Sequence, residues 1–300
     1  MKNQIKNLEA SIRARLNKIA RDSSRDFDAV LLQYFQERFL YRLSISAYKL
    51  NFILKGALLF IAYEIPRSRP TKDIDFLGIN TSSTHADILR VVKEVVVLSG
   101  EDGIRFDPES ITSEVIKKDT DYQGIRINIK AYLGRANRRI HFDIGFGDKI
   151  IPNPVELDFP VLLPDMPYPR LIAYTPESAI AEKLEAIVKL GLATSRMKDF
   201  YDIYHLASHR NFDASILREA IETTFNNRKT SLSKRFEIYK DNFINEKNKQ
   251  LQWNAFLHRH GLKSDLSFPE CVRFIEKFIE PLFERNNLQK KWNYDLQIWN

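Results

Sequence analysis

The stretch that most constrains the fold of this chain is NFILKGALLFIAYEIPRSRPTKDIDFLG, at residues 51–78. Its alternation of apolar runs with a glycine and a polar loop predicts a compact strand, helix and strand unit. The expected elements are a strand at 52–54, a turn at Gly56, a helix at 57–64 and a second strand at 74–77. A basic loop joins the helix to the second strand.

Asp73 and Asp75 lie two residues apart at the second predicted strand. Residues at this spacing point to the same face of a strand, so the two carboxylates project together while Ile74 and Phe76 face a core. Neighbouring acids repel each other and cost stability unless a cation lies between them. Mg²⁺ is the expected cation, because it binds one or two carboxylates together with substrate phosphates. The pair alone also fits a solvated strand end or a turn cap, where Asp is common.

The order of strand, glycine, helix, basic loop and Asp-x-Asp strand resembles the start of the nucleotidyltransferase fold of polymerase-beta-like enzymes. More narrowly, KG at 55–56 and RPTKDIDF at 69–76 resemble the first motif of the AbiEii/AbiGii toxin family of nucleotidyltransferases. Many relatives have Gly-Gly or Gly-Ser where this chain has Gly56-Ala57. The resemblance implies that the residues facing the nucleotide phosphates are Lys55, Gly56, Arg69 and Thr71.

Three more strands are predicted after the Asp-x-Asp strand, at 110–117, 122–133 and 138–146. In the last of them apolar and polar residues alternate, and Asp143 falls on the polar side. A third metal ligand would occupy this position on the open face of a mainly antiparallel sheet. The alternative is an outward Asp on a half-exposed strand.

Length and composition set the domain organisation and the class of protein. The 300 residues suit one large or two ordinary domains, and 44% hydrophobic content is sufficient for packed cores. No apolar run reaches the roughly 18 to 20 residues that span a bilayer, and no secretory signal is recognisable, so we expect a cytoplasmic protein without membrane contact. Cys271 is the single cysteine, which excludes an internal disulfide and a cysteine-rich zinc site.

Helical periodicity dominates both ends of the chain. Residues 4–20 and 24–49 are predicted to form two helices, the second covering the sheet. A proline-rich connection begins at Ile150, and nearly all of the sequence after it is helical in pattern. The predicted class is therefore α+β. A nucleotidyltransferase-type mixed sheet with helices on one face would occupy residues 1–165, and a mainly helical domain residues 166–300.

Two helical segments of the second half also resemble the family. AEKLEAIVKLG at 181–191 and RMKDFYDIYHL at 196–206 are similar to the second and third motifs of AbiEii-type enzymes. The resemblance implies that Lys183 contacts the nucleotide triphosphate and that Asp199 completes the site. The similarity covers residues 50–206, so no motif assigns the helical tail.

The residues alone allow a simpler interpretation of these two segments. Lys183 would be a surface lysine paired with Glu177 or Glu185, and Asp199 an early-turn acid that interacts with the helix dipole. Asp202, one turn later, is expected to pair with Lys198 or Arg196.

The combined interpretation is an NTP-using nucleotidyltransferase of the AbiEii toxin type, dependent on Mg²⁺ or on Mn²⁺ in its place. The expected metal ligands are Asp73, Asp75 and Asp143. Lys183 would supply positive charge in the transition state, and Asp199 would act as a base or as an electrostatic positioner. In relatives the acceptor is the 3′ end of tRNA and a partner antitoxin restrains the activity, so the resemblance implies both partners here.

The net charge of +7 is compatible with an RNA acceptor, although many basic proteins bind no nucleic acid. The cations expected to contact RNA are Arg126, Lys130, Arg139, Lys229, Lys234, Arg235, Lys240, Lys247 and Lys249. Candidate base-stacking residues are Phe236, Tyr239 and Phe243. Two other functions stay open: a small-molecule nucleotidyltransferase, such as an antibiotic-modifying enzyme, and a catalytically inactive nucleic-acid-binding or assembly protein, which the Gly56-Ala57 departure motivates.

Overall fold

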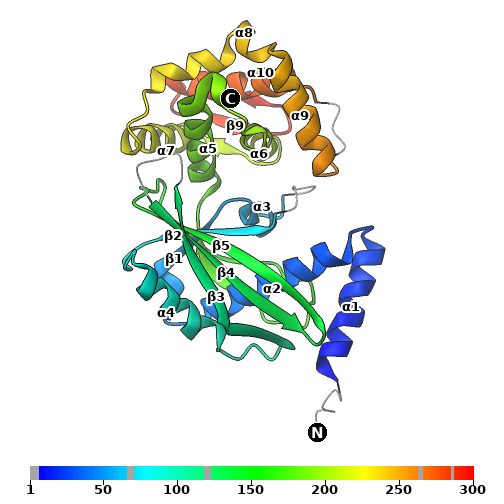
Figure 1. The fold of residues 1–300 in the computed structure, drawn as a ribbon. Helices are drawn as coiled ribbons and strands as arrows, with labels where there is room; N and C mark the ends of the chain where they lie inside the picture. The colour runs from blue at the N-terminus through cyan, green and yellow to red at the C-terminus, as the bar shows by residue number, and fades with distance from the viewer. Residues whose placement is uncertain (1–6, 66–70, 118–122, 263–265, 285–286) are drawn as a thin grey trace. The chain divides into compact units, whose positions relative to one another are not determined.

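The computed structural model describes residues 7–65, 71–117, 123–262, 266–284 and 287–300 (Figure 1). The chain divides into two compact units. Unit 1 comprises residues 1–62, 70–147 and 155–173, and unit 2 comprises residues 63–69, 148–154 and 174–300. The division at residue 165 stays a prediction, and each unit is described by itself. Among the described helices, none is long and apolar enough to cross a membrane.

Unit 1 contains a seven-stranded mixed sheet with the order β3-β4-β5-β2-β1-β7-β6 (Figure 1). Its strands are β1 (Phe52–Lys55), β2 (Asp73–Gly78), β3 (Ile104–Lys117), β4 (Gln123–Leu133), β5 (Ala136–Phe146), β6 (Val155–Asp158) and β7 (Arg170–Ala173). Four neighbouring pairs are antiparallel, while β2 with β5 and β1 with β7 are parallel. The predicted α+β class with a mixed sheet is confirmed. β3 begins earlier than the strand predicted at residue 110, and a bulge interrupts its pairing with β4 between Asp107 and Thr112.

Helices pack on one face of this sheet. The helical elements of unit 1 are α1 (Leu8–Asp22), α2 (Phe27–Ser44), η1 (Lys49–Asn51), α3 (Leu58–Ala62) and α4 (His85–Val96). Phe39 of α2 stacks on Phe142 of β5, with ring centroids 4.6 Å apart, and lies 6.5 Å from the ring of Phe76 on β2. Because side chains alternate along a strand, the residues next to Phe76 and Phe142 project from the opposite face.

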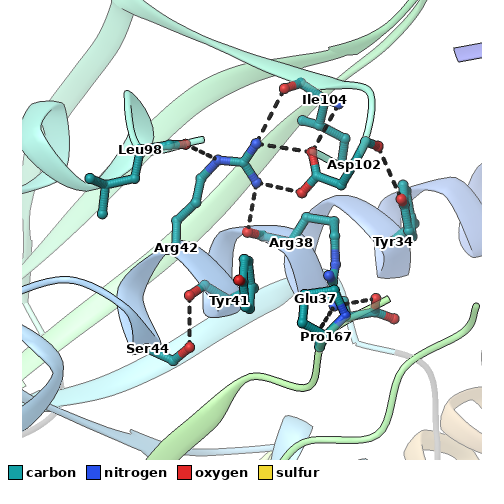
Figure 2. A network of polar contacts seen from close by, with 10 residues as sticks. All are labelled: Tyr34, Glu37, Arg38, Tyr41, Arg42, Ser44, Leu98, Asp102, Ile104 and Pro167. Atoms are coloured by element: carbon teal, nitrogen blue, oxygen red, sulfur yellow. Dashed lines mark hydrogen bonds and ion pairs between the residues drawn. The ribbon is translucent and has the colours of Figure 1, made fainter. Parts of the chain in front are cut away.

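α2 also buries charged side chains, in addition to the apolar residues with which it covers the sheet. Arg42 donates to both carboxylate oxygens of Asp102, at 2.7 and 3.0 Å, and to three backbone carbonyls (Figure 2). Tyr34 donates to the carbonyl of Asp102 at 3.0 Å. These bonds satisfy the buried charges and join α2 to the start of β3.

A second buried pair on α2 lies one turn away. Glu37 and Arg38 are fully buried and 2.7 Å apart. Glu37 accepts from the backbone N–H of Leu162. Arg38 donates to the carbonyl of Pro167 (Figure 2). Burial raises the pKa of Glu37 to about 7. The pair therefore fixes the proline-rich stretch before β7 against α2.

Unit 2 is mainly helical, as predicted. Its elements are α5 (Pro176–Leu190), η2 (Gly191–Ala193), α6 (Met197–Ala207), β8 (Phe212–Asp213), α7 (Ala214–Asn227), η3 (Leu232–Tyr239), α8 (Asp241–Ile244), α9 (Lys247–Arg259), α10 (Phe268–Ile279), η4 (Glu280–Phe283), β9 (Lys291–Asn293) and β10 (Ile298–Trp299). Thr175 caps α5 through the backbone N–H of Ser178, and Pro176 occupies the first turn. The small sheet β10-β9-β8 was not predicted. Cys271 is buried in α10.

Candidate active site

The acids of β2 and β5 lie side by side on the face of the sheet opposite α2. In the parallel pairing of these strands Asp75 is directly opposite Asp143, and Asp73 is opposite His141. Paired strands are about 4.8 Å apart, so three carboxylates gather within one small area. The structure thus brings together the three acids that the sequence proposed as metal ligands.

The electrostatics of Asp73 reflect this crowding. Its pKa is raised above the usual value, first by burial and then by the negative charges of Asp75 and Asp143. The positive charges of Arg126 and His141 act in the opposite direction. Because the raising effects prevail, ionising Asp73 costs more free energy in the folded protein than in the unfolded chain.

Arg126 of β4 neutralises one member of the cluster. It lies opposite Asp143 in the antiparallel pairing of β4 with β5. Its Nε and Nη2 atoms donate to the two carboxylate oxygens of Asp143 at 2.8 and 2.9 Å. This bidentate pair raises the pKa of Arg126, mainly through the hydrogen bonds. The sequence had assigned Arg126 to RNA binding, but the shared polar parity of the two strands could have indicated the pair.

The donor set can be tested against a divalent metal ion. Within the described residues, no group of three or more His, Cys, Asp and Glu side chains is arranged to hold one. Asp73 and Asp75 present carboxylates of the kind that Mg²⁺ uses, whereas Arg126 engages both oxygens of Asp143. The residues therefore fit a cation held by Asp73 and Asp75, with Asp143 joining only after Arg126 has released it.

The turn after β1 abuts the same acids. Lys55 is buried and lies opposite Asp75 in the antiparallel pairing of β1 with β2. Gly56 follows with φ of +73°, and a Cβ atom there would overlap Oδ2 of Asp75. Only glycine meets both conditions, because a side chain disfavours this φ and would displace the carboxylate. Gly56 therefore lies against the Asp75 carboxylate. The sequence had predicted only that Gly56 faces the nucleotide phosphates.

Two further candidate phosphate ligands, Arg69 and Thr71, precede β2 in the sequence. Thr71 donates through Oγ1 to the backbone carbonyl of Asp73 at 3.1 Å, which braces the start of the strand. Arg69 lies outside the described residues.

In unit 2, Lys183 of α5 is held by the acids of α6. Its Nζ atom lies 2.7 Å from Oδ2 of Asp202 and 3.4 Å from Oδ1 of Asp199. Both acids are buried, and Arg196 donates to the other oxygen of Asp199. Lys183 is 12% exposed, so the surface-lysine interpretation is wrong. Asp202 pairs with Lys183 through tertiary packing, and the expectation of a partner at Lys198 or Arg196 was based on local spacing alone.

Part of the predicted RNA-binding surface is buried. Lys249 is 2% exposed and donates to the carbonyls of Leu192 and Thr194 at 2.9 and 3.1 Å. Arg235 is buried and forms a bidentate pair with Glu280 at 2.9 and 3.0 Å. These two cations are structural, so the prediction that they contact RNA phosphates is wrong.

The aromatic residues of the same segment divide in a similar way. Phe243 is buried in the core of unit 2, and the pKa of Tyr239 is raised strongly by burial. Phe236 is 50% exposed, and Tyr239 is partly exposed.

The comparisons with known proteins were as follows. A family model described as "Nucleotidyl transferase AbiEii toxin, Type IV TA system" matches residues 38–274. Similar solved structures include a candidate nucleotidyltransferase from H. pylori, with 17% identity, a TM-score of 0.43, and coverage of 87% of this chain and 100% of that chain. JHP933 from Helicobacter pylori has 15% identity, a TM-score of 0.41, and coverage of 86% and 99% in the same order. An antigenic nucleotidyltransferase-like protein from Paracoccidioides brasiliensis has 13% identity, a TM-score of 0.33, and coverage of 67% and 93%.

The curated proteins gave no match. The range matched by the family model includes the acids of β2 and β5 and also the pairing of α5 with α6.

Proposed function

Because the chain belongs to the AbiEii family of nucleotidyltransferase toxins, we propose that it transfers a nucleoside monophosphate from an NTP to an acceptor hydroxyl, with pyrophosphate as the leaving group. The observation that carries the proposal is the register of β2 with β5, which gathers Asp73, Asp75 and Asp143 on one polar face. An acid cluster in which Asp75 and Asp143 raise the pKa of the buried Asp73 suits a cationic cofactor.

Asp73 and Asp75 would hold a divalent cation. Asp143 would become a third ligand once its hydrogen bonds with Arg126 are broken. Mg²⁺ or Mn²⁺ bound there would neutralise the triphosphate and orient the attacking oxygen. A guanidinium that leaves Asp143 stays close to the acid cluster, where it can bind a phosphate oxygen. Arg126 would then exchange one anionic partner for another.

The remaining roles concern the phosphates. The turn at Lys55 and Gly56 would present backbone N–H groups to phosphate oxygens, with Arg69 and Thr71 on the loop before β2. Lys183 would add positive charge where negative charge develops. For Asp199 we favour the positioning role over the base, because cations engage both of its carboxylate oxygens.

The acceptor that the family implies is the 3′ end of tRNA, and the proposed biological role is that of the toxin in a toxin–antitoxin system. The family description, which names a Type IV TA system, supports this role and an antitoxin partner. A small-molecule acceptor is the second candidate. The burial of Arg235 and Lys249 favours it, because it reduces the basic surface available to RNA.

The test is to incubate the purified protein with Mg²⁺ and one labelled NTP at a time, with total RNA or with a panel of small hydroxyl-bearing acceptors. Labelled RNA supports the proposal, whereas label confined to small acceptors supports the second candidate. Asp75→Asn is the inactive control, and omission of Mg²⁺ with added chelator tests the cofactor. Absence of label from every acceptor, with all four NTPs and with either metal, would contradict the proposed transfer.

A further inference from the structure

The polar face of unit 1 continues beyond the acids along β4 and β5. Two residues from Asp143 along β5, His141 lies opposite Asn128 and forms a hydrogen bond with it. Two residues further, Arg139 lies directly opposite Lys130. At a rise of about 3.3 Å per residue, this second pair is roughly 13 Å from Asp143.

Lys130 and Arg139 are both exposed, and they are like charges at facing positions. Such pairs destabilise a sheet unless an anion compensates them. In the described part of the chain, no carboxylate lies within ion-pair distance of either side chain. Asp107, which faces Lys130 from β3, instead accepts the backbone N–H of Glu109 at 3.2 Å. The two cations are therefore available to an anionic ligand.

The next pair along the same face is aromatic. Tyr132 lies opposite Arg105 of β3, and the guanidinium carbon is 4.2 Å from the centre of the tyrosine ring. Arg105 is exposed and Tyr132 is half-buried. A ring and a guanidinium in contact offer flat surfaces on which an unpaired base can stack. This pair lies roughly 20 Å from the acids, a distance that a small-molecule acceptor does not span.

We propose that the single-stranded end of the RNA acceptor binds along this face, which we call the β4–β5 track: Lys130, Arg139, Tyr132 and Arg105. The terminal hydroxyl lies at the acid cluster, backbone phosphates contact the two cations, and a base stacks against the tyrosine and arginine. The inference rests on the proposed function, since it assigns the binding surface for the acceptor of that reaction. The end must be single-stranded, because bases within a duplex are stacked on each other and cannot reach the platform.

The experiment measures binding of a fluorescent single-stranded oligoribonucleotide to the full chain at several salt concentrations. Lys130→Glu with Arg139→Glu should weaken binding by about 10-fold or more and reduce the slope of log affinity against log salt by roughly 1.4, the value for two phosphate contacts on a single strand. Lys93→Glu is the matched control. It reverses an exposed lysine on α4, which packs on the other face of the sheet, and it should leave both quantities unchanged.

Tyr132 supplies a second, independent measurement. Tyr132→Ala should weaken binding by roughly 5- to 100-fold if one base is stacked there, and Tyr132→Phe should restore it because the ring is kept. Lys130→Gln with Arg139→Gln replaces the reversal if the glutamates impair folding, as judged by circular dichroism.

The outcomes separate this inference from the proposed function. If the wild type labels RNA and the variants of the track bind and label RNA as the wild type does, the proposed track is wrong and the proposed transfer stands. A blunt duplex that binds as tightly as the single strand would also overturn the inference. If the wild type labels only small molecules, the RNA acceptor and the track fail together.

Discussion

The Arg126–Asp143 pair gives the most quantitative prediction about unit 1. Arg126→Ala removes two hydrogen bonds to a buried carboxylate and leaves that carboxylate next to Asp73 and Asp75 without its guanidinium. Hydrogen bonds to charged groups contribute roughly 1.5 to 3 kcal/mol, and breaking a fully buried ion pair costs about 3 to 5 kcal/mol. The Arg126 side chain is 36% exposed, so solvent screening lowers the expected loss of unfolding free energy to about 1 to 3 kcal/mol.

Urea denaturation of the single and double variants measures this loss. Asp143→Asn in the Arg126→Ala background should cost less than the sum of the two single changes, because the pair is already broken. The matched control is Arg170→Ala, which removes an equally bidentate but solvent-exposed partner of Asp158 and should change stability little. Added Mg²⁺ or Mn²⁺ should stabilise Arg126→Ala more than the wild type, since both oxygens of Asp143 become free. Equal losses at Arg126 and Arg170, or strict additivity in the double variant, would refute the reasoning.

Three further predictions concern the candidate site. Asp73→Asn should abolish transfer without unfolding the protein. Because the pKa of Asp73 is raised in the folded protein, ionisation of this carboxyl removes stability as the pH rises from its unfolded pKa through its folded pKa. The melting temperature of the wild type should therefore fall relative to that of Asp73→Asn as the pH rises above about 4, the ordinary pKa of an aspartate. A constant difference in melting temperature would contradict the raised pKa. Gly56→Ala should lower both transfer and melting temperature, because it adds strain at positive φ and displaces Asp75, and unchanged turnover would argue against that contact. Lys183→Ala should reduce transfer by orders of magnitude, measured per folded molecule. It should also lower the stability of unit 2 by about 3 kcal/mol or more, because it leaves Asp202 buried without its lysine. This loss is larger than the one expected for a surface lysine. Normal transfer activity in this variant would show that Lys183 is not part of the site.

The sequence predicted the features that depend on local periodicity. Alternation along a strand is a property of the backbone, so the polar parity of Asp75 and Asp143 was readable before their neighbours were known. Which residue of β4 faces Asp143 depends on strand register, which the turn between β4 and β5 sets at a distance from the acid. Arg126 was therefore predicted to contact RNA, whereas in the structure it is the partner of a buried acid.

The second half shows the same limit more clearly. Lys249 and Arg235 occur in a segment whose composition is that of a solvated surface, yet both are buried with oxygen partners far away in the sequence. The strand β8 has two residues, which are too few to show any periodicity in the sequence. Its partner β9 is far away along the chain, at Lys291–Asn293. Features made by long-range pairing leave no local pattern, which is why the small sheet was not predicted.

The path of the chain through the two units bears on how such a protein can change over generations. The chain leaves unit 1 after Ala62, after Gly147 and after Ala173, so stretches that belong to unit 2 interrupt the coding sequence of unit 1. Ala173, at the end of β7, pairs with both Leu54 of β1 and Val155 of β6, which places the last part of unit 1 in the interior of its sheet. A recombination breakpoint placed before that residue would divide unit 1, and one placed after it would divide unit 2. The gene therefore offers no position at which one unit could be inherited without the other.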